Sequence, residues 1–325
     1  MAKAGSWLIT GAGGFLGNVL VRELLARGEH VRAGIRRNRE ALKGLECEQV
    51  VIDITKPETL PAAFEGLPHP ITVVHCAGMV SIAGVVSPML QKVNVEGTRN
   101  MLEAAKRAGA GTFIHISSVH AIPEKPGTMR EVTHFDPEAV IGGYARTKAE
   151  ATQLVLDGTG MRRIIIHPAG ITGPGDFDDS HLTRLVRDLA SGQLKVVVPG
   201  GYDFVDVRDV VSAIIEAQKR GRDGEPYIIS GHYASVPEIA GVVSQLTGRR
   251  PPAVVPMWLA KTFAPLAEFS AKLRKAAPLF TSYSLHTLAA PSNFDHSKAT
   301  RELGHRPRPL AESLADTVAW LKQDK

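Results

Sequence analysis

The stretch Thr10–Gly17, TGAGGFLG, decides the fold of this 325-residue chain. It follows a short apolar run at Trp7–Thr10, which is typical of a β-strand, and it precedes a helical pattern. Strand, glycine turn and helix in this order open a nucleotide-binding βαβ unit. Gly11 would permit the tight bend, Gly14 would let the backbone approach a pyrophosphate, and Gly17 would allow helix and strand to pack closely. The amides of the helix N-terminus would then bind the pyrophosphate.

Strand patterns alternate with helical patterns through the first half of the chain. Five further strands are expected at His30–Ile35, Val50–Ile52, Ile71–His75, Thr112–Ile116 and Met161–Ile166. Helices are expected at 57–64, in a long stretch ending near residue 109, and around residue 144. This alternation predicts an α/β fold, a Rossmann-type doubly wound parallel sheet.

The pattern becomes less regular after a loop at 171–176. Helices are expected near 181–190, 207–219, 237–246 and 256–275, with short strands near 195–198 and 227–229. We therefore predict a dinucleotide-binding Rossmann domain at 1–175 that also receives parts of 203–232. Residues 176–325 would mainly form a smaller C-terminal α/β substrate-binding cap with C-terminal helices.

The end of the second strand is basic, because Ile35 is followed by Arg36-Arg37-Asn38-Arg39. A site that prefers NAD usually has an acidic residue here for the ribose 2′-hydroxyl, and none is present. A guanidinium suits a 2′-phosphate, so Arg36, with Arg37 beside it, indicates NADP(H) rather than NAD(H). A solvated basic loop is the alternative.

The ends of the other strands carry small or polar residues that suit a ligand, because ligands bind at the carboxyl ends of such sheets. Asp53 lies where an adenine amino group would be, and the small Cys76-Ala77-Gly78 segment would let a cofactor lie against the backbone. Ser117 and Ser118 end the fifth strand, where a serine can donate a hydrogen bond to a substrate oxygen. His75 is expected to be a packed histidine.

Tyr144 and Lys148 stand four residues apart within a helical pattern, so they share one helix face. A cation held beside a phenol favours the phenolate and lets the tyrosine exchange a proton nearer neutral pH. Such a pair also arises by chance, and its significance here depends on the motifs upstream of it.

Composition narrows the functional classes. Apolar residues make up 44% of the chain, the net charge is +5 and the pI is near 9.2, but no basic run with interleaved aromatics favours nucleic-acid binding. Two cysteines without metal spacing predict no metal site and a reducing, cytoplasmic setting. The opening MAKAGSWLIT leads straight into a strand pattern, so no secretory signal is expected. Charged residues interrupt the apolar stretch 257–280, so no integral membrane segment is expected.

With these motifs in place, the chain resembles the extended short-chain dehydrogenase/reductase family, within the NAD-dependent epimerase/dehydratase superfamily. The matching motifs run in order over nearly the whole chain: Thr10–Gly17, Asp53, Asn94, Ser118, Tyr144 with Lys148, His167-Pro168, Gly173–Asp176, Phe204–Val210 and the ending Asn293–Trp320. Val31–Arg36 resembles the dihydroflavonol reductase-like branch, which uses NADPH. The Tyr202–Val210 region and the tail also resemble hopanoid-associated sugar epimerase-like proteins. Nucleotide-sugar epimerases commonly carry Arg-Pro where this chain has His167-Pro168.

The resemblance implies a set of roles. Tyr144 would be the general acid, Lys148 would bind the nicotinamide ribose, Ser118 would polarise the substrate oxygen with Ser117 as the alternative, and Asn94 would hold the helix and a relay water. Cofactor contacts are implied at Gly11, Gly13, Gly14, Phe15, Leu16, Gly17, Arg36, Arg37, Asp53, Ile54, Cys76, Ala77, Gly78, Ser117, Tyr144, Lys148, His167, Pro168 and Gly170. Substrate contacts are expected at Ser118, Tyr144, Val80, Phe177, His181 and Tyr202, although the cap aromatics could equally be packing.

Three functions remain open from the sequence. The leading one is an NADP(H)-dependent oxidoreductase that acts on a small-molecule carbonyl or alcohol. An NAD-dependent nucleotide-sugar epimerase or dehydratase is the second, and a non-catalytic NADP(H)-sensing protein is the third. Relatives often form homodimers through the helices that correspond to 88–108 and 143–157. The helix 256–275 would pack against the core, line an apolar substrate entrance or touch a membrane surface.

Overall fold

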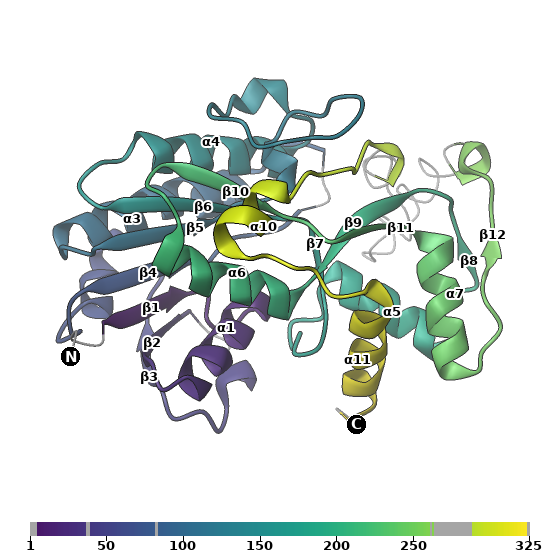
Figure 1. Ribbon diagram of the computed structural model, residues 1–325, viewed down its shortest axis with the longest axis horizontal. Helices are drawn as coiled ribbons and strands as arrows, with labels where there is room; N and C mark the ends of the chain where they lie inside the picture. The colour runs from purple at the N-terminus through teal and green to yellow at the C-terminus, as the bar shows by residue number, and fades with distance from the viewer. Residues whose placement is uncertain (1–4, 37–39, 82–83, 261, 263–287, 324–325) are drawn as a thin grey trace.

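Seven parallel strands form the central sheet of the protein (Figure 1). The computed structural model describes residues 5–36, 40–81, 84–260, 262 and 288–323. The strand order is β10-β6-β5-β4-β1-β2-β3, and every neighbouring pair is parallel. The strands are β1 Ser6–Thr10, β2 His30–Ile35, β3 Glu48–Val51, β4 Ile71–His75, β5 Thr112–Ile116, β6 Arg162–Pro168 and β10 Glu225–Ile229. The order reverses between β1 and β4, so the carboxyl ends of these strands border the crevice where such sheets bind ligands.

Helices cover both faces of this sheet, which explains why β1, β4 and β5 are buried along their whole length. On one face, α1 and α6 pack together over Ile9 and Ile114. On the other face, α3 and α4 pack over Val73 and Phe113. The bounds are α1 Phe15–Ala26, α3 Gly97–Arg107, α4 Gly143–Asp157 and α6 Val207–Arg220, and a short α2, Pro88–Gln91, leads through a π-helical turn at Lys92–Glu96 into α3.

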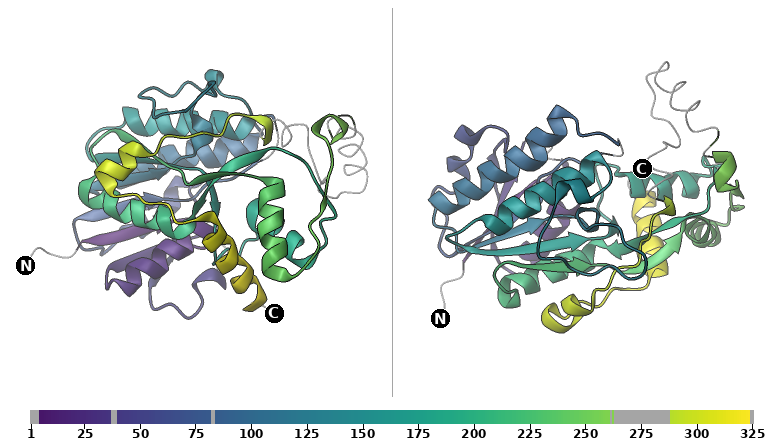
Figure 2. Two further views of the ribbon diagram at one scale, coloured as in Figure 1. Left: turned by 45° about the vertical axis from the view of Figure 1, so that its right-hand side comes forward. Right: turned by 90° about the horizontal axis from the view of Figure 1, so that it is seen from above.

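A smaller lobe lies beyond the carboxyl end of β6 (Figures 1 and 2). Its sheet has the order β11-β9-β7, with α5, α7 and α11 packed together around a separate core. The elements are β7 Gly170–Thr172, α5 His181–Ser191, β8 Val196–Val197, β9 Gly201–Asp206, β11 His232–Ser235, α7 Val236–Thr247, β12 Ala253–Val254 and α11 Leu310–Gln323. The chain returns to the first lobe at α10, Ser297–Leu303, which packs on α6 and β10.

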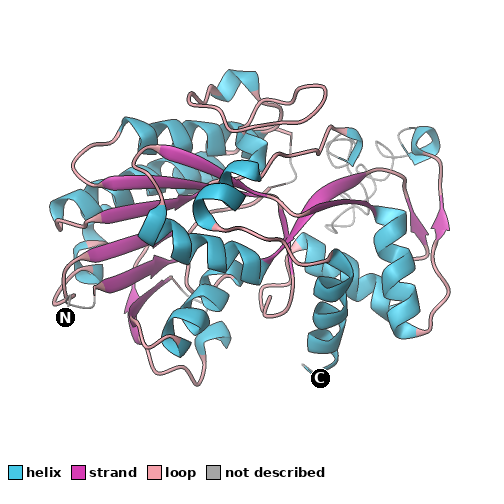
Figure 3. Ribbon diagram, viewed as in Figure 1, coloured by secondary structure: helices cyan, strands magenta, loops and turns pink. Residues whose placement is uncertain are grey.

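The predicted fold class is confirmed, and Figure 3 shows strands and helices alternating through the larger lobe. The number of strands in the main sheet differs from the expectation. Residues 225–229 join it as a seventh strand beside β6; the sequence indicated a short strand at 227–229 and a return of parts of 203–232 to this domain, but six strands in the sheet.

Two local predictions were wrong. The helix expected at 57–64 is a pair of short 3₁₀ turns, Pro57–Thr59 and Pro61–Ala63, because Pro61 has no N–H to continue an α-helix. The loop expected at 171–176 contains the end of β7, which pairs with β9 about thirty residues later in the chain. Within the long helix ending near residue 109, Asn94 sits in the π-helical turn.

Two other expectations concern residues outside the described part of the chain. Arg37 lies outside it, as does most of the helix expected at 256–275, of which residues 256–260 and 262 are described.

Candidate active site

The first turns of α4 bring Tyr144 and Lys148 to the carboxyl edge of the sheet. Gly142 precedes the helix with φ of 101°, a conformation that favours glycine. A Cβ on Gly143 would overlap the backbone carbonyl of Val85, so glycine permits the loop after β4 to pack against the start of α4. The catalytic candidate Tyr144 therefore follows two positions that only glycine fills without strain.

Lys148 reaches from α4 into the interior of the sheet. Its Nζ donates to the carbonyl of Ile116, the last residue of β5, at 2.8 Å. The residue is buried, and burial lowers the pKa of Lys148 to about 8. A Cβ on Gly78 would lie 3.5 Å from this Nζ, so the small segment after β4 borders the ammonium.

The two serines after β5 have different environments. The Ser117 hydroxyl lies 2.6 Å from that of Thr152 on α4, and Thr152 itself donates to the Lys148 carbonyl at 2.7 Å. Because the Thr152 proton is used in that bond, Ser117 is the donor to Thr152. The Ser117 hydroxyl is thus directed at α4.

Ser118 instead ends the strand region and begins a short 3₁₀ turn, Val119–Ala121. Its Oγ accepts from the backbone N–H of His120 at 3.2 Å, so its hydroxyl proton remains available to a substrate oxygen. The His120 ring lies edge-on to the Tyr144 ring at 6.3 Å between centroids. The sequence reading missed His120, and its position two residues after the serine pair was the only signal for it.

Asn94 connects three elements around this edge. Its Oδ1 accepts from the Met79 N–H at 2.7 Å, and its Nδ2 donates to the Met79 carbonyl at 2.9 Å and to the Thr147 hydroxyl at 3.1 Å. The π-helical turn that presents Asn94 is of a kind often found at functional sites. Asn94 therefore holds the loop after β4 against α4.

His75 holds the same turn from inside the sheet. Thr98 donates to the Asn94 carbonyl at 2.7 Å, so His75 Nε2 must donate to Thr98, at 3.1 Å. Its Nδ1 then accepts from Thr10, at 2.9 Å. Burial lowers the pKa of His75 to about 3, so the ring is neutral, as a packed histidine should be.

The glycine turn has the geometry of a pyrophosphate cradle. Gly11 has φ of 66°, and a Cβ there would lie 2.7 Å from the Ala77 nitrogen. A Cβ on Gly17 would overlap the Gly11 carbonyl. Gly14 immediately precedes α1, and Gly13, Phe15 and Leu16 complete the turn and the start of the helix. Side chains would fill the space where backbone must approach a dinucleotide, so the residues present fit such a cofactor.

Arg36 and Asp53, the residues predicted for the adenosine end of the cofactor, follow β2 and β3. Arg36 is exposed directly after β2. Asp53 accepts two hydrogen bonds from Thr55, at 3.0 and 2.8 Å. Slight burial raises the pKa of the Asp53 carboxyl. The bonds from Thr55 and the nearby charge of Arg36 lower it by more, so the pKa of Asp53 lies below its usual value. Ile54, beside Asp53, is buried against Gly97 of α3.

Cys76, which is half-buried, and His167, which is fully buried, both lie near Lys148. Burial raises the pKa of the Cys76 thiol to about 12, so it is not a thiolate nucleophile. His167 is fully buried on β6, with Nδ1 2.8 Å from the Ser118 carbonyl. Pro168 ends β6 and Gly170 begins β7, where a Cβ would lie 3.1 Å from the Asp203 carbonyl.

The four predicted substrate residues other than Ser118 and Tyr144 are dispersed. Phe177 packs edge-on against Trp320 at 5.5 Å, beneath the Arg22 guanidinium, so its contacts are with α11 and α1. Val80 is exposed in the loop after β4, and His181 is exposed at the start of α5. Tyr202 lies on β9, edge-on to Phe204 at 6.1 Å.

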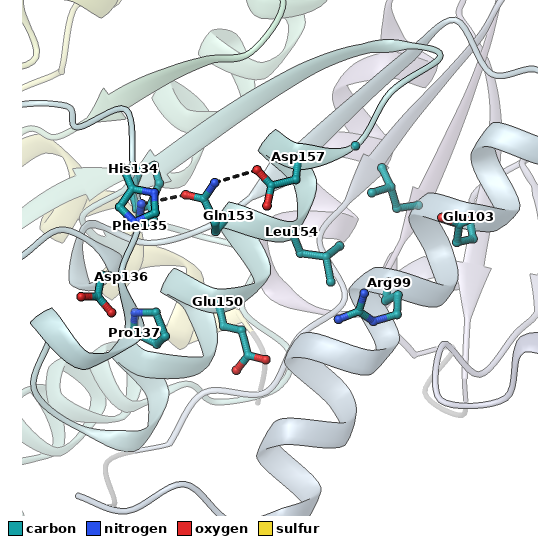
Figure 4. A pocket seen from close by; sticks show the side chains of 12 residues that line it. Arg99, Glu103, His134, Phe135, Asp136, Pro137, Glu150, Gln153, Leu154 and Asp157 are labelled. Carbon is teal, nitrogen blue, oxygen red and sulfur yellow. Dashed lines mark hydrogen bonds between the residues drawn. The ribbon is translucent and has the colours of Figure 1, made fainter.

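A cavity of about 500 Å³ opens elsewhere, on the outer side of α3 and α4 (Figure 4). Its lining includes Arg99, Glu103, Glu150 and Asp157, and no predicted site residue lines it. Among the described residues, no group of three or more His, Cys, Asp or Glu side chains could hold a metal ion. In the same part of the chain, no helix is both long and apolar enough to cross a membrane.

The parallel sheet and the glycine turn at its edge are those of a Rossmann-type dinucleotide-binding protein. Residues 7–230 match the NAD dependent epimerase/dehydratase family, and the chain belongs to that family. This confirms the resemblance and shows an NAD(P)-dependent enzyme family with a Rossmann-type fold.

Three similar proteins illustrate the relationship. The sterol demethylase protein B of Methylococcus capsulatus is 36% identical over 97% of this chain and 98% of that protein. The putative dihydroflavonol 4-reductase of Synechocystis sp. is 31% identical over 99% of this chain and 96% of that protein. The crystal structure of gox2253 superposes with a TM-score of 0.84 at 31% identity, and covers 98% of both chains.

Proposed function

We propose that this protein is an NADP(H)-dependent reductase that converts a carbonyl to an alcohol, or catalyses the reverse oxidation, with Ser118, Tyr144 and Lys148. One observation carries the proposal. The Lys148 ammonium is bonded to the last carbonyl of β5, with Ser118 two residues beyond that carbonyl and Tyr144 one helical turn before the lysine. A proton donor, a cation and a hydroxyl donor therefore converge at the edge where the cofactor cradle opens.

Each residue has a distinct task in this proposal. A bound nicotinamide would supply or accept the hydride. Tyr144 donates a proton to the substrate oxygen during reduction and takes it back during oxidation. Lys148 favours the phenolate form of Tyr144, and Ser118 donates its free hydroxyl proton to the substrate oxygen and so stabilises the developing charge.

The preference for NADP(H) rests on Arg36. It is exposed directly after β2, and its charge reaches Asp53, two residues after the neighbouring strand β3, so a ribose 2′-phosphate would meet a guanidinium there. Titration of the purified protein with NADPH and NADH tests this preference. We expect tighter binding of NADPH and a loss of at least tenfold in Arg36→Glu, with no loss in the control Arg301→Glu on the distant helix α10. Tighter binding of NADH, or NAD that copurifies and resists removal, would refute the assignment and favour the epimerase.

The substrate is proposed to be a bulky apolar ring compound. Six of the eleven large exposed hydrophobic residues in the described part of the chain lie in the loop and helix after β4 or just before α4: Met79, Val80, Val85, Val86, Met89 and Ile141. Asn94 and Gly143 hold this apolar rim beside Tyr144. Such patches on soluble proteins commonly mark binding sites. The names of two relatives refer to a sterol and a dihydroflavonol, which are both fused-ring molecules.

A direct assay separates the candidate functions. NADPH oxidation is followed with cholestanone, with dihydroquercetin and, for comparison, with UDP-glucose. Turnover of a ring ketone that is lost in Tyr144→Phe supports the proposal. Conversion of UDP-glucose without net cofactor oxidation would establish the epimerase, and NADPH binding without turnover of any ketone would favour the sensing protein.

We further propose a homodimer in the cytoplasm, with residues 1–175 and 176–325 as the cofactor and substrate domains. The support is indirect. Cys47 and Cys76 are both free thiols, which suits a reducing compartment, and α3 and α4 present an open outer surface. Sedimentation analysis of the wild type and of Arg99→Glu tests the dimer; a monomer in both would refute it.

A further inference from the structure

His167 lies beside the proposed catalytic serine because of the β5–β6 register. Ile116 pairs with Ile166, and the Ser117 N–H donates to the Ile166 carbonyl at 2.8 Å. The next residue of β6, His167, therefore faces the backbone of Ser118. Its ring is fully buried and stacks on Phe135, with centroids 5.1 Å apart and planes 20° from parallel.

The hydrogen bond to Ser118 determines the tautomer of His167. A carbonyl oxygen can only accept, so Nδ1 must carry the proton in the 2.8 Å contact with Ser118. Burial lowers the pKa of His167 to about 4, although the bond to Ser118 acts in the opposite direction. The ring is therefore neutral near pH 7, and Nε2 is a bare nitrogen with no hydrogen-bond partner among the described residues. His75, on β4, has the opposite tautomer, with its proton on Nε2.

Ser118 is consequently held at two atoms. Its carbonyl accepts from His167 Nδ1 and, within the 3₁₀ turn, from the Ala121 N–H at 3.0 Å, and its Oγ accepts from the His120 N–H. The bond from His167 ties the peptide that carries the side chain to β6, and the bond from His120 orients the hydroxyl. Loss of the His167 bond would leave this carbonyl bonded only within its own turn, to the Ala121 N–H, and would remove the bond that ties it to β6.

We propose that His167 is a positioning residue for Ser118: the neutral ring, protonated at Nδ1, fixes the Ser118 peptide so that its hydroxyl points at the substrate oxygen. This inference rests on the proposed function, since it assigns His167 a role through the catalytic serine. His167 does not itself touch the reacting atoms, and it acts only through Ser118.

Two variants at one position test the donor. His167→Leu is close in volume and has no donor, whereas His167→Asn offers an amide N–H near the place of Nδ1. With cholestanone and NADPH, we expect His167→Leu to lower kcat at least tenfold while KM and the Kd for NADPH change less than twofold. We expect His167→Asn to recover kcat to within about threefold of the wild type. If Asn performs no better than Leu, the donor role is refuted.

A double-mutant cycle distinguishes positioning from general structural support. In a Ser118→Ala background, His167→Leu should lower kcat no further than twofold, because there is no hydroxyl left to orient. If the fall in kcat of the double variant equals the product of the falls in the two single variants, the proposal is overturned. Thermal unfolding is measured for each variant to check that it folds. If His167→Leu does not fold, His167→Gln is used in its place, because the glutamine amide extends toward the place of Nε2 rather than Nδ1.

Nitrogen NMR of histidine-labelled protein provides a readout that requires no substrate. A His167 signal protonated at Nδ1 and bare at Nε2 supports the inference, and the reverse tautomer would overturn it. If the wild type reduces no ketone, the proposed function has failed, and the tautomer still decides whether His167 holds Ser118.

Discussion

Replacement of Lys148 by Met should make the cofactor-free protein more stable and inactive. The folded protein lowers the pKa of this buried ammonium from 10.5 to about 8. That change corresponds to about 3 kcal/mol of unfavourable free energy for holding the cation in the fold. Loss of the donor to the Ile116 carbonyl would cost about 1 kcal/mol. Lys148→Met should therefore stabilise the fold by about 2 kcal/mol at pH 7.

The pH dependence gives the sign of the effect. Below pH 8 the ammonium is charged in both the folded and unfolded states, so the folded protein carries the full cost. Between pH 8 and 10.5 the folded protein has released a proton that the unfolded chain still holds, so the wild type gains stability as pH rises. The advantage of Lys148→Met should shrink across that range.

Urea unfolding followed by tryptophan fluorescence, at pH 7 and at pH 10, measures both quantities. Lys106→Met is the matched control, because Lys106 is exposed on α3 and its removal should change stability by less than about 0.5 kcal/mol. A Lys148→Met protein that is less stable than the wild type at pH 7 would refute the reasoning. An advantage that is unchanged at pH 10 would do the same.

Three further predictions follow from the geometry. Ser118→Ala should lower kcat at least a hundredfold, whereas Ser117→Ala should change kcat less than fivefold, because the Ser117 hydroxyl is directed at α4. Similar falls in kcat for the two variants in steady-state assays would contradict this prediction. Gly17→Ala should weaken NADPH binding at least tenfold by calorimetry because its Cβ would overlap the turn, while Gly241→Ala, with open space around it, should leave binding intact. Asp206→Ala should destabilise the fold by about 3 kcal/mol in urea unfolding, because the carboxylate caps α6 and pairs with the Arg208 guanidinium at 2.8 Å. A loss of stability below about 1 kcal/mol would contradict this prediction.

Local patterns were readable because their geometry is set within a few residues. The glycine turn requires close backbone approaches at Gly11 and Gly17, and no other residue type allows them. Tyr144 and Lys148 share a helix face by their spacing alone. For the same reason the first, second, fourth and fifth strands were placed to within one residue of their observed bounds.

Contacts between distant segments could not be read from the sequence. The strand β7 is three residues long and looks like a glycine-rich loop until β9 pairs with it. The sequence indicated that parts of 203–232 return to the Rossmann domain, but not that β10 pairs with β6, about sixty residues earlier in the chain. Pairing energy of this kind depends on a partner that local propensity does not reveal.

The sequence by itself determined the class of fold, the cofactor cradle and the candidate Tyr-Lys pair. Only the tertiary structure decided that the Ser117 hydroxyl is directed at α4, that the Ser118 hydroxyl accepts from the His120 N–H, and that His167 is neutral with its proton on Nδ1. The physical reason is that hydrogen-bond direction and burial depend on which groups meet in space. Adjacent serines have the same chemistry in the sequence, and the fold makes them different.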